Sequence, residues 1–214
     1  MSAGISITFE LNLKPEVAAG FIGLGQVILQ ETQKYSGFHH VRIVQHKKDP
    51  NRLLFIERWE NESAYNAYIA ARTATVELAG MQSLAVKTET NVWPNLIAES
   101  IKDVTAAAAN DGVSITFSLM VNPTVVKPFT DAARSSEFFT GIAAFDGFRS
   151  IRMVQHRDDP TRILFIQRWA SESAYQAYYD WRDERGEIEG LRKVSVYFHI
   201  DVWPTLVANA FPPQ

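Results

Sequence analysis

The first residues of the chain alternate strictly between apolar and polar side chains. The apolar positions are Ile5, Ile7, Phe9, Leu11 and Leu13. Because successive side chains of a β-strand point to opposite faces, this period of two predicts a half-buried strand. Pro15 follows, and the first turn of a helix tolerates proline because its N–H would have no partner there. The pattern therefore predicts a strand followed by a helix.

Two strands, a helix and a last strand complete the pattern. A strand is expected after Gly37, a turn at Asp49-Pro50-Asn51, and a third strand over Arg52–Trp59. Asn61 is a typical N-cap, so a second helix begins there. A fourth alternating strand runs to Val-Trp-Pro at residues 92–94. The order β-α-β-β-α-β predicts a four-stranded antiparallel sheet with helices on one face.

The whole pattern then occurs a second time. Residues 37–68 and 147–178 are identical at 20 of 32 positions, and both copies close on Val-Trp-Pro. A period of about 110 residues exceeds the 20–50 residues of solenoid repeats, so each copy has the size of a domain. We predict one domain over residues 1–100 and another over 112–214. A helix is expected from Pro94 into an Ala-rich linker at 101–111.

A sheet with helices on one face leaves its other face uncovered, and a second copy on the same chain can cover it. The predicted fold class is therefore α+β, with two ferredoxin-like β-α-β-β-α-β units in tandem. Together they are expected to form a pseudo-dimeric α+β barrel that is closed within one chain. Assembly into a further homo-oligomer is left open.

Composition narrows the classes of function. Hydrophobic residues make up 46% of the chain and the net charge is −3, with no cysteine. This is globular composition, and it provides no basic field for nucleic acid or an anionic membrane. Thiolate metal sites and thiol nucleophiles are excluded, and no closely spaced His and carboxylate set indicates a metal. Without a recognisable signal peptide or membrane span, a cytoplasmic protein is expected.

The third strand of each copy carries the clearest candidate site. Alternation places Phe55, Glu57 and Trp59 on one side of the strand. The helices are expected to enclose an apolar cleft on that side, with a few polar tips such as Tyr65, as in many small-molecule pockets. The corresponding residues of the second copy are Phe165, Trp169 and Tyr175.

Residues 37–68 and 147–178 share a longer motif: Gly-Phe, a strand, Asp-Pro-x-Arg, an apolar strand ending in Trp, then Glu-Ser-Ala-Tyr. The motif resembles the antibiotic biosynthesis monooxygenase family of dimeric α+β barrel proteins. The best-understood branch looks like small cofactor-free oxygenases that convert phenols or anthrones to quinones, with the substrate as the reductant of O₂. The resemblance implies a cofactor-independent monooxygenase that takes a phenolic or polyketide-like aromatic and O₂, without cofactor or metal.

The resemblance also implies site residues. In that branch a Trp at the end of the third strand and a Tyr six residues later line the pocket. The matching residues are Trp59 and Tyr65 in the first copy and Trp169 and Tyr175 in the second. An assisting Arg about twenty residues past the Trp is replaced here by Ala79 and Glu189. Arg72 and Arg182 are the nearest substitutes, and these six residues are the catalytic candidates.

Other functions and residues stay open. The alternatives are a non-catalytic ligand-binding protein and a non-oxidative cyclase or isomerase of the same fold. Haem degradation is disfavoured, because resembling enzymes need an axial histidine after the Trp and neither 61–80 nor 171–190 contains one. His199 with Asp201 is a weaker candidate for an oriented base.

Some residues are interpreted structurally. His46 and His156 are read as hydrogen-bonded or solvated residues at the sheet edge, with a general base as the functional alternative. Arg58 and Arg168, which neighbour Glu57 and Gln167, are read as surface or interface charges. Small residues in the helices of the first copy leave volume, whereas the second copy has aromatic ones, namely Phe138, Phe139, Phe145, Tyr179 and Trp181. The first copy is therefore expected to hold the roomier pocket, unless those aromatics line a site for a flat ligand.

Overall fold

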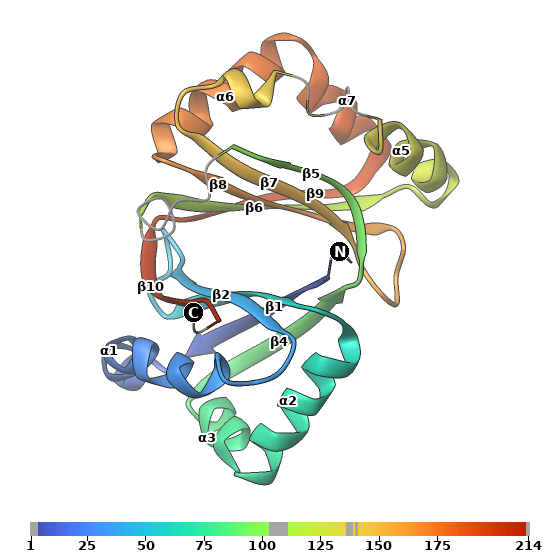
Figure 1. The fold of residues 1–214 in the computed structure, drawn as a ribbon. Coiled ribbons are helices and arrows are strands. Elements are labelled where there is room, and N and C mark those ends of the chain that lie inside the picture. Colours follow the sequence, from blue (N-terminus) through green and yellow to red (C-terminus); the bar gives the residue numbers. More distant parts are fainter. Residues whose placement is uncertain (1–3, 103–110, 136–138, 140, 213–214) are drawn as a thin grey trace. The chain divides into compact units, whose positions relative to one another are not determined.

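A computed structural model describes residues 4–102, 111–135, 139 and 141–212. The chain forms two compact units, of which unit 1 comprises residues 1–94 and 205–214 and unit 2 residues 95–204. Each unit contains a five-stranded antiparallel sheet with helices (Figure 1). The predicted α+β class is confirmed, and the ferredoxin-like fold occurs twice.

The sheet of unit 1 has the order β10-β2-β3-β1-β4. Its strands are β1 (Ile5–Leu13), β2 (Phe38–Gln45), β3 (Arg52–Trp59), β4 (Ala85–Trp93) and β10 (Thr205–Ala210). One face carries the helices α1 (Pro15–Thr32), α2 (Glu62–Ala74) and α3 (Glu77–Ser83) (Figure 1). Pro15 begins α1 as predicted, and the Asn61 side chain caps α2.

Unit 2 repeats this arrangement with the order β5-β7-β8-β6-β9. Its strands are β5 (Asn95–Ile101), β6 (Val113–Val121), β7 (Phe148–Gln155), β8 (Arg162–Trp169) and β9 (Ser195–Trp203). The helical elements are η1 (Pro123–Val125), α5 (Val126–Ala133), η2 (Ile142–Ala144), α6 (Glu172–Glu184) and α7 (Glu187–Val194). The second helix predicted for each copy is thus two helices, and Gly80 and Gly190 lie inside α3 and α7.

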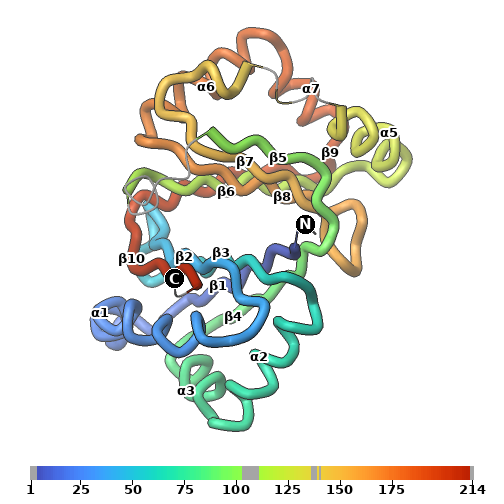
Figure 2. The backbone as a smooth tube through the Cα atoms, in the orientation of Figure 1, coloured from blue at the N-terminus to red at the C-terminus, as the bar shows by residue number. Residues whose placement is uncertain are grey.

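The two sequence copies exchange the strands that follow their Val-Trp-Pro motifs. β5 follows Pro94 yet pairs with β7 of unit 2, and β10, near the end of the chain, lies beside β2 of unit 1 (Figure 2). The helix predicted after Pro94 is therefore wrong over Asn95–Ile101. Pairing with an open sheet edge outweighs the helix preference of residues such as Ala98 and Glu99. Glu99 also accepts a hydrogen bond of 2.7 Å from Arg152 of β7.

This exchange explains why each sheet has five strands where four were predicted. Because of this exchange, the boundaries between the two compact units lie at residues 94/95 and 204/205, and they differ from those of the predicted ranges 1–100, 101–111 and 112–214. That those three ranges are two domains and a linker stays a prediction, and most of the linker lies outside the described residues. Closure of the two sheets into one barrel likewise stays a prediction.

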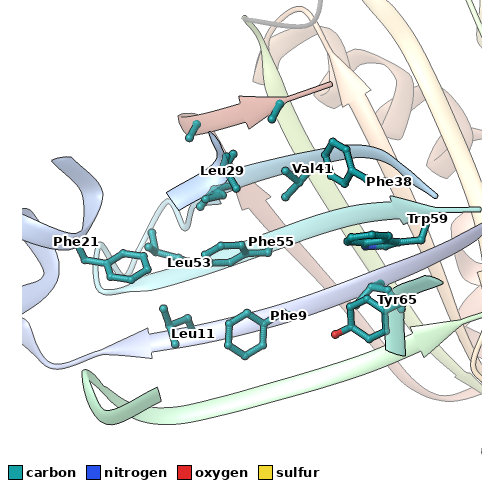
Figure 3. Close-up of a cluster of buried hydrophobic side chains, with 14 of the residues drawn as sticks. Phe9, Leu11, Phe21, Leu29, Phe38, Val41, Leu53, Phe55, Trp59 and Tyr65 are labelled. Atoms are coloured by element: carbon teal, nitrogen blue, oxygen red, sulfur yellow. The ribbon is translucent and has the colours of Figure 1, made fainter. Parts of the chain in front are cut away.

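The core of unit 1 lies between the sheet and its helices. Figure 3 shows Phe9 of β1, Phe55 and Trp59 of β3, and Tyr65 of α2 on this side of the sheet. All four are buried, and Trp59 has no exposed surface. The tight turn at Gly37 helps α2 to approach β3: its φ is +78°, and a Cβ atom there would lie 2.6 Å from the Cβ of Ala64.

The tryptophan of each Val-Trp-Pro motif links the last predicted strand of its copy to the first, β4 to β1 and β9 to β6. Trp93 Nε1 donates a hydrogen bond of 2.9 Å to Thr8 Oγ1, and Trp203 Nε1 donates one of 2.8 Å to Thr116 Oγ1. Both tryptophans are buried, so the indole N–H needs such a partner. The repeated motif therefore has a structural role in both units.

Candidate functional site

Unit 1 contains a cavity of about 300 Å³ between its helices and its sheet. The walls are mostly apolar and include Phe9, Ile28, Leu29, Val41, Phe55, Ile69, Leu78 and Met81. Polar groups on the walls are Thr32, Glu57, Tyr65, Asn66, Tyr68, Arg72, Gln82 and Thr90. An apolar space with a few polar side chains is the usual composition of a small-molecule site.

Two elements supply the polar groups that could do chemistry. Strand alternation turns Glu57 towards the helices, on the same face as Phe55. On α2, the spacing of three or four residues places Tyr65, Tyr68 and Arg72 along one face of the helix. The N-cap of α2 sets where that face begins, because the Ala64 N–H donates 2.9 Å to the Asn61 side chain.

Glu57 is a buried carboxylate on the cavity wall. Only 5% of its surface is exposed, and Ile7 and Val41 stand beside it on the neighbouring strands. Trp59 Nε1 donates a hydrogen bond of 2.8 Å to Glu57 Oε2. Burial disfavours the charged form and raises the pKa of Glu57 to about 7, although the Trp59 hydrogen bond and the Arg72 charge oppose this. This carboxyl group therefore titrates near neutral pH.

Alternation predicted Glu57 on the helix side of its strand, but the residue was not among the catalytic candidates. Glu57 shares its strand face with Phe55 and Trp59, and both of these residues are buried. The alternation alone placed a carboxylate under the helices. The general tendency of glutamate to stay exposed concealed that signal.

Tyr65 and Tyr68 add two hydroxyl groups to the cavity. Burial, followed by the nearby charge of Glu57, raises the pKa of Tyr65 and raises that of Tyr68 to about 12. Tyr68 Oη lies 3.3 Å from Thr32 Oγ1, and its ring stacks on Trp59 with the ring centroids 4.9 Å apart. Both tyrosines stay protonated at neutral pH, so they can donate hydrogen bonds but not accept a proton.

Arg72 brings positive charge to the cavity from the last turn of α2. It pairs with Glu77 of α3, and its guanidinium carbon lies 5.7 Å from the ring centroid of Tyr68. The Arg72 charge also favours the ionised form of Glu57. A cation held beside an aromatic wall can stabilise negative charge that develops on a bound molecule.

The structure thus brings together the three residues predicted in the first copy. Tyr65 and Arg72 line the cavity, whereas Trp59 is fully buried and hydrogen-bonds to Glu57. Their catalytic role stays a prediction. Sequence reasoning missed Glu57 and also Thr32, whose neighbour Tyr68 comes from a distant part of the chain.

Unit 2 keeps the same framework with one change of charge. Trp169 Nε1 donates 3.1 Å to Gln167 Oε1, and the Trp169 and Tyr175 ring centroids are 6.0 Å apart. Arg182 Nε lies 2.7 Å from Glu187 Oε2. A neutral amide therefore occupies the place that Glu57 holds in unit 1. That Trp169, Tyr175 and Arg182 are catalytic stays a prediction.

Aromatic rings pack closely at the equivalent place in unit 2. The ring centroid of Phe117 lies 5.1 Å from that of Phe165 and 4.6 Å from that of Phe198. Thr88 stands in unit 1 where unit 2 has Phe198. Phe138 lies outside the described residues, and the expectation that the first copy holds the roomier pocket stays a prediction.

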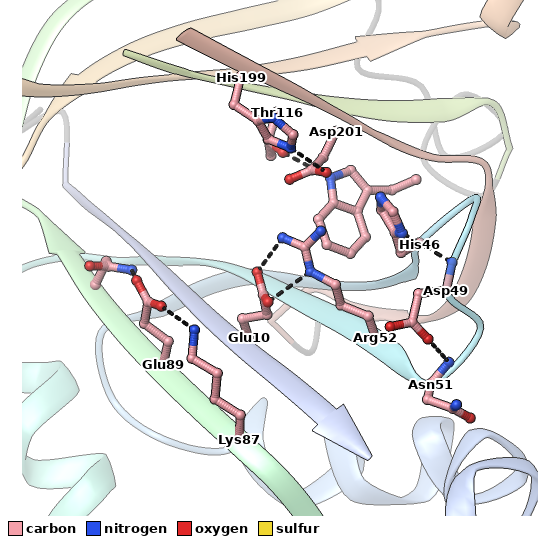
Figure 4. Close-up of polar contacts among 12 residues, drawn as sticks. Glu10, His46, Asp49, Asn51, Arg52, Lys87, Glu89, Thr116, His199 and Asp201 are labelled. Carbon is pink, nitrogen blue, oxygen red and sulfur yellow. Dashed lines mark hydrogen bonds and ion pairs between the residues drawn. The ribbon is translucent and has the colours of Figure 1, made fainter. Parts of the chain in front are cut away.

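Three histidines have partners close by in the sequence, and Figure 4 shows two of them, His46 and His199. His46 Nδ1 accepts a hydrogen bond of 3.1 Å from the Asp49 N–H, and His156 accepts two of 3.2 Å from the equivalent turn. These contacts fit the hydrogen-bonded interpretation of both residues. His199 Nε2 and Asp201 Oδ1 are 3.1 Å apart, so the pair suggested by the sequence does form.

The part of the chain that the structure describes contains no group of three or more His, Asp or Glu side chains that could hold a metal ion. No helix within it has the length and apolar character needed to cross a membrane.

Comparisons with known proteins agree with this architecture. The profile of the family described as antibiotic biosynthesis monooxygenase matches residues 4–74 and 117–182. No curated protein matches the sequence. A proposed monooxygenase from Lactobacillus acidophilus NCFM is 15% identical, with a TM-score of 0.75 over 97% of this chain and 96% of that one.

Two other solved structures are also similar. An anthrone oxidase-like protein is 13% identical, with a TM-score of 0.75 over 99% of this chain and 94% of that one. A major regulator of staphylococcal pathogenesis is 10% identical, with a TM-score of 0.58 over 94% of this chain and 99% of that one. At these identities the likeness shows the fold alone.

Proposed function

The chain belongs to the antibiotic biosynthesis monooxygenase family, and on this premise we propose that unit 1 is a cofactor-independent monooxygenase. Its substrate is a phenolic or polyketide-like aromatic, which it oxidises with O₂ to a quinone. The reaction takes place in the cavity between the sheet and helices of unit 1.

The cavity is the observation that carries this proposal. Its volume of about 300 Å³ lies at the lower end of the range for small-molecule sites. A cavity of this size can take a small aromatic molecule of about one to three fused rings. The aromatic side chains Phe9, Phe55 and Tyr65 suit the flat faces of such rings.

The chemistry balances without an outside reductant. The substrate loses one proton from its hydroxyl group, and the resulting phenolate passes an electron to O₂. The two radicals combine at the ring carbon opposite the oxygen, and the peroxide accepts a proton. That carbon then loses its hydrogen as a proton while the O–O bond breaks, which leaves a quinone and one water. The substrate supplies all four electrons that reduce O₂.

The protein has to bind, orient and desolvate the substrate and stabilise negative charge. The hydroxyl groups of Tyr65 and Tyr68 stay protonated and can donate to the substrate oxygen. Arg72 adds a positive charge on the same helix face. These groups support a site for an anion derived from a phenol.

Oxygen uptake with a panel of naphthols and anthrone tests the proposal. We expect uptake above the rate of autoxidation, with one water and one quinone formed per O₂. Tyr65→Phe should lower kcat/KM about tenfold or more, because one buried donor is lost, whereas Tyr175→Phe in unit 2 should leave it within about twofold. Autoxidation rates throughout the panel would overturn the proposal.

A second candidate is ligand binding without turnover. Unit 2 favours it, because that unit keeps the Trp–Tyr–Arg framework but carries Gln167 in place of a carboxylate. The fold also occurs in a regulator of staphylococcal pathogenesis. Calorimetry separates the two functions: heat of binding for naphthols without any oxygen uptake would favour this candidate.

A further inference from the structure

We infer that Glu57 is the general base of unit 1, which removes the hydroxyl proton of a bound phenol, and that unit 2 lacks this step because Gln167 replaces it. The inference rests on the proposed function of the cavity of unit 1, since it names the group that starts the reaction there. It assigns one competent site to a chain that contains two similar units.

Glu57 has the position that a base requires. Glu57 lies on the wall of the cavity of unit 1, and it reaches that wall from β3 in the middle of the sheet. Ile7 and Val41 flank it on the adjacent strands and offer no competing proton. The Trp59 N–H binds one carboxylate oxygen, Oε2, at 2.8 Å. Because Glu57 lines the cavity, the proton of the ligand goes to the other oxygen, Oε1.

The charged and titratable groups around Glu57 explain why its carboxylate can act as a base near neutral pH. Arg72 of α2 provides the positive charge, with Glu77 of α3 paired to it from behind. Tyr65 and Tyr68 face the carboxyl group from α2, and burial together with the Glu57 charge keeps both protonated through raised pKa values. Burial raises the pKa of Glu57 to about 7, which is close to the value at which a base works best near neutral pH.

The proton can be followed through the reaction. The substrate O–H bond breaks, the proton moves to a Glu57 oxygen, and a phenolate remains. After O₂ has added to the ring, the neutral Glu57 carboxyl returns this proton to the peroxide. Glu57 then takes the proton from the ring carbon as the O–O bond breaks, and passes it to the departing hydroxide. Both protons end in water, and Glu57 is again ionised.

The chain itself provides the evidence that the carboxylate is not needed for folding. Gln167 accepts a hydrogen bond of 3.1 Å from Trp169 Nε1, the same contact that Glu57 accepts from Trp59. An amide thus satisfies the buried indole in an otherwise equivalent strand. The substitution Glu57→Gln is therefore expected to preserve the fold and remove only the base.

The first experiment measures, without oxygen, how Glu57 acts on the hydroxyl group of a bound phenol. Para-nitrophenol is bound to the full chain under nitrogen, and the pKa of the bound phenol is read from its spectrum across a series of pH values. Ionised Glu57 beside the phenol oxygen opposes formation of a phenolate, so the pKa of the bound phenol should be higher in wild type and in Gln167→Met than in Glu57→Gln. Equal values in wild type and Glu57→Gln would overturn the assignment of the base.

The second experiment measures oxygen uptake against pH with the best substrate of the panel. Wild-type kcat/KM should rise with pH through about pH 7, and Glu57→Gln should be about 100-fold slower or more. Activity of Glu57→Gln within about threefold of wild type would overturn the inference while leaving the proposed function intact. If the pKa of the bound phenol depends on Glu57 but no oxygen is taken up, the base stands and the proposed oxygenase fails.

Discussion

The indole N–H of Trp59 donates a hydrogen bond of 2.8 Å to the carboxylate of Glu57, two residues earlier on the same strand. Residues two apart on a strand point to the same face, so this contact follows directly from the β-structure. It links the residue that the family resemblance predicts to the carboxylate that the sequence reading overlooked. Trp59 therefore acts on the cavity through Glu57, as a positioning residue.

The first prediction concerns the stability of Glu57→Gln. The pKa of Glu57 is raised from 4.5 to about 7 in the folded chain, so the unfolded chain ionises first as the pH rises. Ionisation of the buried group then opposes folding, and wild-type stability falls between about pH 4.5 and 7. Glu57→Gln has no such group, so its free energy of unfolding should exceed that of wild type above pH 7, by at most about 3 kcal/mol.

Chemical denaturation followed by tryptophan fluorescence at several pH values measures this difference. The advantage of Glu57→Gln should disappear at acidic pH, where the carboxyl group is neutral in both states. A difference that is the same from acidic to alkaline pH would contradict the assigned titration of Glu57.

The second prediction concerns Trp59→Phe. The Trp59 hydrogen bond favours the ionised carboxylate, so its loss should raise the pKa of Glu57 further. A hydrogen bond to a charged group contributes about 1.5–3 kcal/mol, which predicts that the acidic limb of kcat/KM moves upwards by about one pH unit or more. Trp169→Phe removes a ring of the same size in unit 2 and should leave the limb in place. Equal shifts in both variants would indicate a general packing effect.

The third prediction compares Arg72→Gln with Arg182→Gln. Arg72 lines the cavity and stabilises negative charge there, so its removal should lower kcat about 100-fold and raise the pKa of Glu57. Arg182 pairs with Glu187 in unit 2, which has no carboxylate at the equivalent place. Steady-state oxygen uptake of Arg182→Gln should stay within about twofold of wild type. A comparable loss in both variants would place the reaction in both units.

Much of the fold could be predicted because its signals are local. Alternation revealed the strands, Asn61 the start of α2, and the repeated motif the second unit. The strand Asn95–Ile101 could not be recognised, because its partner β7 lies in the next copy and no local pattern reports a distant pairing. The same limit applies to β10, whose partner β2 lies near the other end of the sequence.

The candidate site was predictable in outline and not in its chemistry. Trp59 and Tyr65 were found by their spacing, and Arg72 by its position on the next helix. Glu57 has a carboxyl group where its counterpart Gln167 has an amide, and the sequence does not reveal how strongly burial shifts the pKa of that carboxyl group. The structure explains the shift, because it shows Glu57 buried on a cavity wall.

The break between α2 and α3 leads to the last prediction. Val76 stands there with a φ of 54° and is 72% exposed, whereas unit 2 has Gly186 with a φ of 73°. A residue with a side chain is strained in this region by about 1–2 kcal/mol, and a β-branched one is an outlier.

Glycine at this position avoids the backbone strain. Its unfolded chain is more flexible, however, and this offsets about 0.5–1 kcal/mol of the gain in stability. Val76→Gly should therefore raise the free energy of unfolding by up to about 1 kcal/mol, and Gly186→Val should lower it by a similar amount. A Cβ atom at Gly186 would meet no atom within 4 Å, so the second effect would come from the backbone alone. Thermal unfolding of both variants checks this, and changes of the same sign would contradict it.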